Sequence, residues 1–139
     1  MNRSQIAEAL FNKLSKKNQA LSAGLNPKWE GWLKSAHNDE EGYYPPIVPM
    51  GEMGYDLSQK KMKKLDKRTA LSAGRIIFIF NKKKHGKDIP GYLRNSRDIE
   101  FWDVDSIKEG ITFEEYYKLE RKRIKKIEIL VKGLVNRIG

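Results

Sequence analysis

Five consecutive apolar residues, Ile76 to Phe80, constrain the fold of this chain more than any other feature of its sequence. Each of the five is β-branched or aromatic, so both faces of the segment are apolar. That pattern is typical of a strand in a parallel sheet that is covered on both faces. A second run, Ile99 to Val104, predicts another strand. Neither run approaches the roughly 20 apolar residues that a membrane-spanning helix needs, so we expect no membrane partner.

Helical periodicity is found near both ends of the chain. Apolar residues at i, i+3, i+4 and i+7 predict a helix over residues 4–17, with Ser4 as its N-cap. Thr112 and Glu115 have the spacing of a capping box, which predicts the start of a long helix. The residues that this helix is expected to bury follow at intervals of three, four or seven: Phe113, Tyr117, Ile124, Ile127, Val131 and Leu134.

The remaining elements are shorter. They are a strand over 19–25, an irregular segment over 26–46, a helix over 47–53 closed by Gly54, a helix over 59–69 and a loop over 81–88. Helices and strands that alternate in this order predict one α/β domain over residues 1–139. We expect a three-layer α/β/α arrangement with helices on both faces of a small parallel sheet.

The composition excludes several kinds of chemistry. The chain contains no cysteine, which excludes a disulfide framework, a thiolate zinc site and a thiol nucleophile within these 139 residues. His37 and His85 are too isolated to suggest a metal site, so we expect no metal and no cofactor. Glu8 falls where a secretory signal would be apolar, which favours a cytoplasmic protein.

The net charge is +10, from 28 Lys and Arg against 18 Asp and Glu. Two basic runs contribute to it: Lys60, Lys61, Lys63, Lys64, Lys67 and Arg68, and then Arg121, Lys122, Arg123, Lys125 and Lys126. Basic patches can neutralise the phosphates of nucleic acids. Because both runs fall on predicted amphipathic helices, we interpret them as solvated helix faces and do not expect nucleic acid as a partner.

Several segments, taken in order, resemble one known family. They are Arg3–Phe11, Ser22-Ala23-Gly24, Met50–Ser58 and Phe101–Asp105. Together they resemble the low-molecular-weight protein tyrosine phosphatases and the thioredoxin-type arsenate reductases that share their fold. The resemblance implies a four-stranded parallel sheet and hydrolysis of phosphotyrosine or a similar phosphomonoester through a cysteinyl-phosphate intermediate. The arsenate reductases use two further cysteines that this chain lacks, which favours the phosphatase.

The resemblance also implies a phosphate site. The catalytic loop of the family is Cys-x5-Arg-Ser, and Arg3 aligns with its arginine, which places the cysteine four residues before Met1. We therefore expect an N-terminally truncated domain that lacks the first strand and the nucleophile and is inactive as given. Asn2, Arg3 and Ser4 would then hold a phosphate, because a guanidinium and the amides of a helix N-terminus both bind anions.

The resemblance assigns the general acid to Asp105, which would protonate the leaving oxygen. The family has Asp-Pro at this position, whereas Ser106 follows here, and the spacing from Trp102 is one residue short. Asp103 therefore competes with Asp105 for this role.

Other interpretations remain open at this point. The chain could instead be a non-catalytic module that binds anions or nucleic acid. Trp29, Trp32, Tyr43 and Tyr44 either wall a pocket for an aromatic phosphoester or pack the long loop onto the sheet. A missing strand would leave a slot beside residues 76–80, through which the chain would self-associate or borrow a strand.

Overall fold

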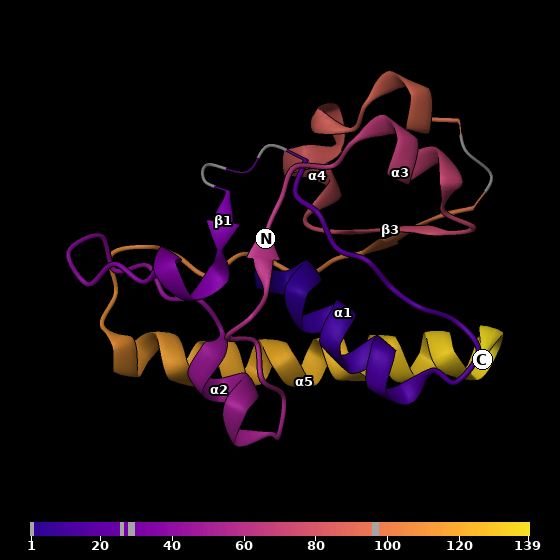
Figure 1. The fold of residues 1–139 in the computed structure, drawn as a ribbon. Coiled ribbons are helices and arrows are strands. Elements are labelled where there is room, and N and C mark those ends of the chain that lie inside the picture. The colour runs from indigo at the N-terminus through magenta and orange to yellow at the C-terminus, as the bar shows by residue number, and fades with distance from the viewer. Residues whose placement is uncertain (1, 26, 28–29, 96–97) are drawn as a thin grey trace.

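The computed structural model describes residues 2–25, 27, 30–95 and 98–139. Its elements in chain order are α1 (Asn2–Leu14), β1 (Gly31–Trp32), η1 (Leu33–Ala36), α2 (Ile47–Glu52), β2 (Lys61–Met62), α3 (Lys67–Ser72), β3 (Ile76–Ile79), α4 (Lys82–His85), η2 (Gly86–Asp88), η3 (Gly91–Leu93), β4 (Ile99–Trp102) and α5 (Phe113–Ile138), where η marks a 3-10 helix. In Figure 1, α5 runs along the bottom of the view with α1 and α2 beside it, and α3 and α4 lie at the top.

The helices predicted at both ends of the chain are confirmed. Thr112 caps α5 by accepting a hydrogen bond from the backbone N–H of Glu115. The two helices pack through apolar faces, with Ile6 and Leu10 of α1 in one core cluster with Ile124, Ile127, Val131 and Leu134 of α5. Ser4 lies inside α1, so its assignment as the N-cap was wrong. Phe113 and Tyr117 were also expected to be buried, but Phe113, in the first turn of α5, is 38% exposed and Tyr117 is only partly buried.

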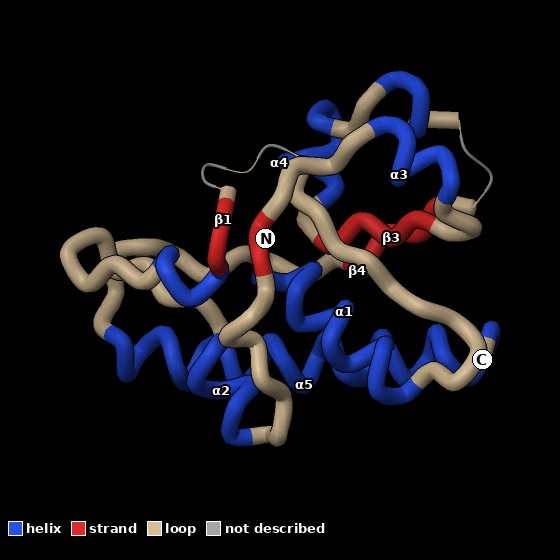
Figure 2. The backbone as a smooth tube through the Cα atoms, in the orientation of Figure 1, coloured by secondary structure: helices blue, strands red, loops and turns tan. Residues whose placement is uncertain are grey.

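The parallel strand pair is confirmed as well. β3 and β4 run parallel, with Ile76 opposite Ile99 and Ile79 opposite Trp102 (Figure 2). Alternate side chains of β3 belong to different core clusters. Ile77 and Ile79 pack with α1 and α5, whereas Phe78 packs with residues of α3, η3 and β4. An all-apolar strand is therefore required here, because both of its faces contact apolar residues.

The predicted strand over residues 19–25 is absent. This segment makes a single isolated bridge, in which Gly24 exchanges backbone hydrogen bonds with Lys63 and Leu65. The Asn12 side chain of α1 donates a hydrogen bond to the backbone oxygen of Ala20 and accepts one from its backbone N–H. A side chain thus takes the place of a neighbouring strand at that residue. The described strands form two sheets of two strands each, β1–β2 and β3–β4.

The predicted helix over residues 59–69 was also wrong. β2 pairs antiparallel with β1 in this region, and of its residues Met62 is buried whereas Lys61 is exposed. The helix α3 begins only after Asp66, whose carboxylate accepts the backbone N–H of Thr69 as an N-cap. The basic run before Asp66 is therefore extended backbone, and the expectation of a basic helix face does not hold there.

The short helix predicted over residues 47–53 is confirmed as α2, and it ends before Gly54, which adopts a φ of 89°. A residue with a side chain rarely adopts that angle, so glycine suits this C-terminal position. Among the described residues, no helix is both long and apolar enough to cross a membrane.

Candidate functional site

Three polar residues from distant parts of the chain lie close together in the structure. Asn81 lies two residues after β3 and Asp105 three residues after β4, so both lie near the carboxyl ends of the parallel strands. The Asn81 Nδ2 donates to Asp105 Oδ1 over 3.4 Å. Arg3, in the first turn of α1, reaches the same place and donates from Nη1 to the backbone oxygen of Val104 over 2.6 Å. The carboxyl ends of parallel strands are where α/β proteins bind their ligands.

The Arg3 guanidinium is only partly accessible, and charged groups surround it. Burial lowers the pKa of Arg3, and the nearby positive charge of Arg123 lowers it further. The carboxylates of Asp105 and Glu120 oppose both effects. Among the described residues, the Arg3 side chain makes one hydrogen bond, which it donates to the backbone oxygen of Val104. Its remaining N–H groups have the donor geometry to bind an anion.

The other two expected phosphate ligands differ in their surroundings. Asn2 donates from Nδ2 to the backbone oxygen of Tyr44 and accepts from the Tyr43 hydroxyl, each over 3.1 Å. Its side chain therefore anchors the loop before α2. Ser4 lies half-buried in the first turn of α1. Burial raises the pKa of Tyr43, so its hydroxyl stays protonated and remains a donor to Asn2 near neutral pH.

The two candidate acids also differ. Asp105 contacts Asn81 and contributes to the electrostatic environment of Arg3. Asp103 is exposed, and its side chain makes no hydrogen bond or ion pair with any residue in the described part of the chain. The structure thus brings Asp105, rather than Asp103, together with Arg3.

A buried ion pair beside this site was missed by the sequence analysis. Glu120 is fully buried, and both of its oxygens accept hydrogen bonds from Arg123 over 2.6 Å. The Tyr116 hydroxyl donates to the same carboxylate over 2.7 Å. The expectation that Arg123 lies on a solvated face was wrong, although Arg121, Lys122, Lys125 and Lys126 are exposed. Intervals of four and three residues connect Tyr116, Glu120, Arg123 and Ile127, and this spacing could have revealed the shared buried face.

The aromatic residues of the long loop mainly pack against the protein. Tyr44 is buried, and its ring lies 5.3 Å from that of Phe113 and 5.2 Å from that of Tyr116. Trp32 is 40% exposed, with the Lys61 ammonium 4.5 Å from its ring centroid. Trp29 lies outside the described residues. Tyr44 therefore packs the loop against α5, whereas Trp32 stays partly exposed and Tyr43 contacts Asn2 at the start of α1.

Across the described residues, no group of three or more His, Asp or Glu side chains could hold a metal ion. His37 and His85 each pair with one nearby aspartate, at 2.9 Å and 3.3 Å.

No protein-family model matches this sequence, and no curated protein and no solved structure matches it either.

Proposed function

We propose that this chain is a phosphatase-like protein that binds a phosphomonoester, such as a phosphotyrosine side chain, beside Arg3. In this proposal the guanidinium of Arg3 and the first amides of α1, including that of Ser4, hold the phosphate. Asp105 occupies the position of the general acid. These 139 residues contain no cysteine, so we propose that they bind the ester without hydrolysing it through a thiolate.

One observation carries the proposal. Arg3 at the start of a 13-residue helix and Asp105, three residues after a parallel strand, come together although 102 positions separate them in the sequence. The resemblance to the phosphatases assigns the same two residues to one site. A helix N-terminus favours a negative charge, and a parallel strand pair directs its carboxyl ends to one edge of the sheet.

The wider fold of the proposal is a three-layer α/β/α domain. The division of the β3 side chains between two core clusters supports it, because it indicates apolar cover on both faces of the strand. We also propose that the chain associates with itself through the edge of β3 opposite β4, because no described strand pairs with that edge. Sedimentation velocity tests this part, and a monomer at all accessible concentrations would contradict it.

The phosphate site is tested with phenyl phosphate, by following the backbone amide signals of the 139-residue chain in NMR titrations. We expect the signals of Arg3, Ser4 and Asp105 to shift together in a saturable manner. Arg3→Lys should weaken binding about tenfold or more, because a point charge replaces a planar fork of donors. Arg137→Lys is the matched control, since Arg137 is exposed in the last turn of α5 and pairs with Glu100 of β4.

Two results would contradict the proposal: equal affinity of Arg3→Lys and Arg137→Lys, or shifts confined to exposed lysines elsewhere. Thermal unfolding of both variants separates lost binding from lost structure, because Arg3 also holds the Val104 carbonyl. Hydrolysis of p-nitrophenyl phosphate is measured in parallel, and turnover that depends on Arg3 would refute the binding-only part.

A further inference from the structure

The excess positive charge is confined to one segment of the chain. Residues 60–98, called the basic segment below, contain thirteen Lys and Arg and three Asp, which gives a net charge of +10. The other residues contain fifteen Lys and Arg and fifteen Asp and Glu, and are therefore neutral overall. A field of one sign over one part of a protein attracts an oppositely charged partner.

Much of the basic segment packs around one core cluster. Its residues supply most of the second core cluster, which includes Ala70, Phe78, Ile89 and Leu93. Arg94 donates to the backbone oxygens of Ile89 and Lys87, which holds η3 against η2. Within the described residues, no carboxylate lies within ion-pair distance of Lys82, Lys83, Lys84 or Lys87, and all four lysines are exposed. Their charges are therefore available to a ligand.

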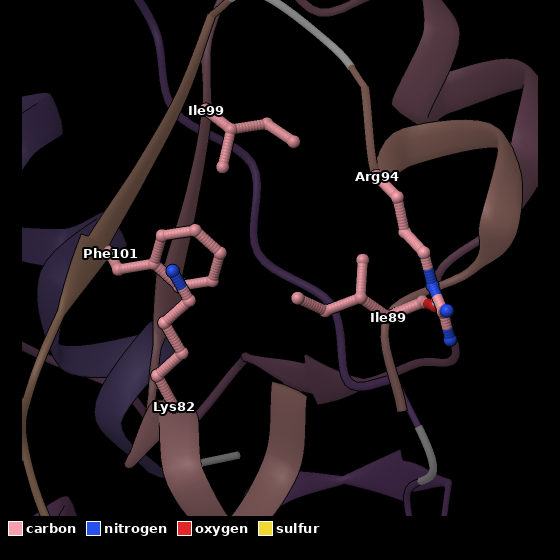
Figure 3. A pocket seen from close by; sticks show the side chains of 5 residues that line it. All are labelled: Lys82, Ile89, Arg94, Ile99 and Phe101. Carbon is pink, nitrogen blue, oxygen red and sulfur yellow. The ribbon is translucent and has the colours of Figure 1, made fainter. Parts of the chain in front are cut away.

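A pocket of about 350 Å³ lies where the basic segment meets β4. Its lining residues are Lys82, Ile89, Arg94, Ile99 and Phe101 (Figure 3). Figure 3 shows Lys82 extending over the ring of Phe101 and Arg94 on the opposite side, beside Ile89. The Lys82 ammonium lies 4.5 Å from the Phe101 ring centroid. Apolar walls with a cation on each side suit a planar ring that carries a phosphate.

We propose that the basic segment binds single-stranded nucleic acid, with one base in the Phe101 pocket and neighbouring phosphates on Lys82, Arg94 and the other α4 lysines. This partner class combines a regularly charged backbone with flat rings, which are the two features that the surface accommodates. A single strand is required because a base within a duplex stays stacked and cannot enter a pocket. The proposal concerns a different set of residues from the phosphate site at Arg3 and does not rest on it.

A membrane surface fits these observations less well. Peripheral binding to anionic lipid combines basic residues with exposed apolar anchors. In the described part of the basic segment, the large apolar side chains that are exposed are Leu71 and Tyr92, and the Lys67 ammonium lies 5.3 Å from the Tyr92 ring centroid. Anionic vesicles are therefore included in the test as the competing partner.

The test measures fluorescence anisotropy of the 139-residue chain with four probes at several salt concentrations. The probes are a labelled 12-nucleotide single strand as RNA and as DNA, an abasic strand of equal length and charge, and the corresponding duplex; phosphatidylserine vesicles serve as competitor. Lys82→Gln/Arg94→Gln removes the two pocket cations. Lys122→Gln/Lys125→Gln removes the same charge from exposed positions of α5. Lys82→Gln alone keeps the carbonyl contacts of Arg94, and circular dichroism verifies the fold of each variant.

We expect the single strand to bind about tenfold more tightly than the abasic strand, because stacking of roughly one base contributes that much binding free energy. The pocket variant should weaken binding about tenfold and reduce the salt dependence by about 1.4 units of slope, because it removes two cations and roughly 0.7 unit is lost for each phosphate contact. The α5 control should change affinity by less than about twofold. Whichever of the RNA and DNA strands binds more tightly identifies the sugar that the surface prefers. Equal binding of the abasic strand, equal loss in the α5 control, or displacement by vesicles at equal charge would overturn the proposal.

Discussion

Replacing Glu120 by Gln tests the buried ion pair of α5 most directly. The substitution keeps the shape of the side chain but removes its charge, which leaves Arg123 as an uncompensated cation with 9% of its surface exposed. Removing one partner of a buried ion pair costs about 3–5 kcal/mol. With a typical urea m-value of roughly 1.5–2 kcal/mol/M, the unfolding midpoint should fall by about 1.5–3 M.

Two further variants identify the cause of this loss. Glu128→Gln removes a more exposed glutamate of α5, which pairs with Lys132 over 3.7 Å, and should cost less than about 0.5 kcal/mol. Glu120→Met/Arg123→Met removes both buried charges and should be more stable than Glu120→Gln by about 2 kcal/mol. The reasoning is refuted if Glu120→Gln unfolds within about 0.5 kcal/mol of the unmodified chain, or if the double variant is no more stable than Glu120→Gln.

Two other predictions concern the loops and the pH dependence of stability. Gly42 has a φ of +62°, and an added Cβ would lie 2.7 Å from the backbone of Gly110. Gly42→Ala should therefore lower the melting temperature by several degrees. Gly51→Ala is the control, because a Cβ at Gly51 in α2 meets open space, and it should not lower the melting temperature. The hydrogen bond from the Thr69 backbone lowers the pKa of Asp66, and the contacts of Glu100 with Arg137 lower the pKa of Glu100 although burial acts in the opposite direction. The stability that these carboxylates provide is complete above their unfolded pKa values, near 4, and is lost as the pH falls through the lower folded values. Asp66→Asn keeps an N-cap but removes its titration, so its melting temperature should fall less steeply below pH 4 than that of the unmodified chain.

The elements that could be predicted are those whose signals are local. The period of α5 and its cap at Thr112 both lie within one segment of sequence, and so does the apolar run of β3. The turn at Gly54 depends on the backbone freedom of one residue. Such signals survive in any tertiary context, because neighbouring residues produce them.

The loop predicted over residues 81–88 is instead helical, as α4 and η2, with the Asn81 side chain accepting the backbone N–H groups of Lys83 and Lys84. The absent strand and the absent helix depended on partners far away in the sequence. Residues 19–25 have the small apolar composition of a strand, but Asn12 satisfies the backbone of Ala20 and no described strand pairs alongside them. Residues 60–64 carry helix-forming lysines, yet Met62 is buried in an extended segment that pairs with β1. Propensity is a weak guide wherever pairing and burial across the fold oppose it.

The candidate sites divide in the same way. The sequence by itself determined which residue types are present: a chain without cysteine, an arginine and a serine at the start of a helix, two aspartates after a strand, and a +10 charge confined to residues 60–98. Only the tertiary structure decided that Asp105 rather than Asp103 lies beside Arg3, and that Arg123 is buried against Glu120. It also decided that Lys82, Arg94 and Phe101 surround one pocket. The physical reason is that composition and periodicity arise from neighbouring residues, whereas burial and site geometry arise when distant segments exclude water together.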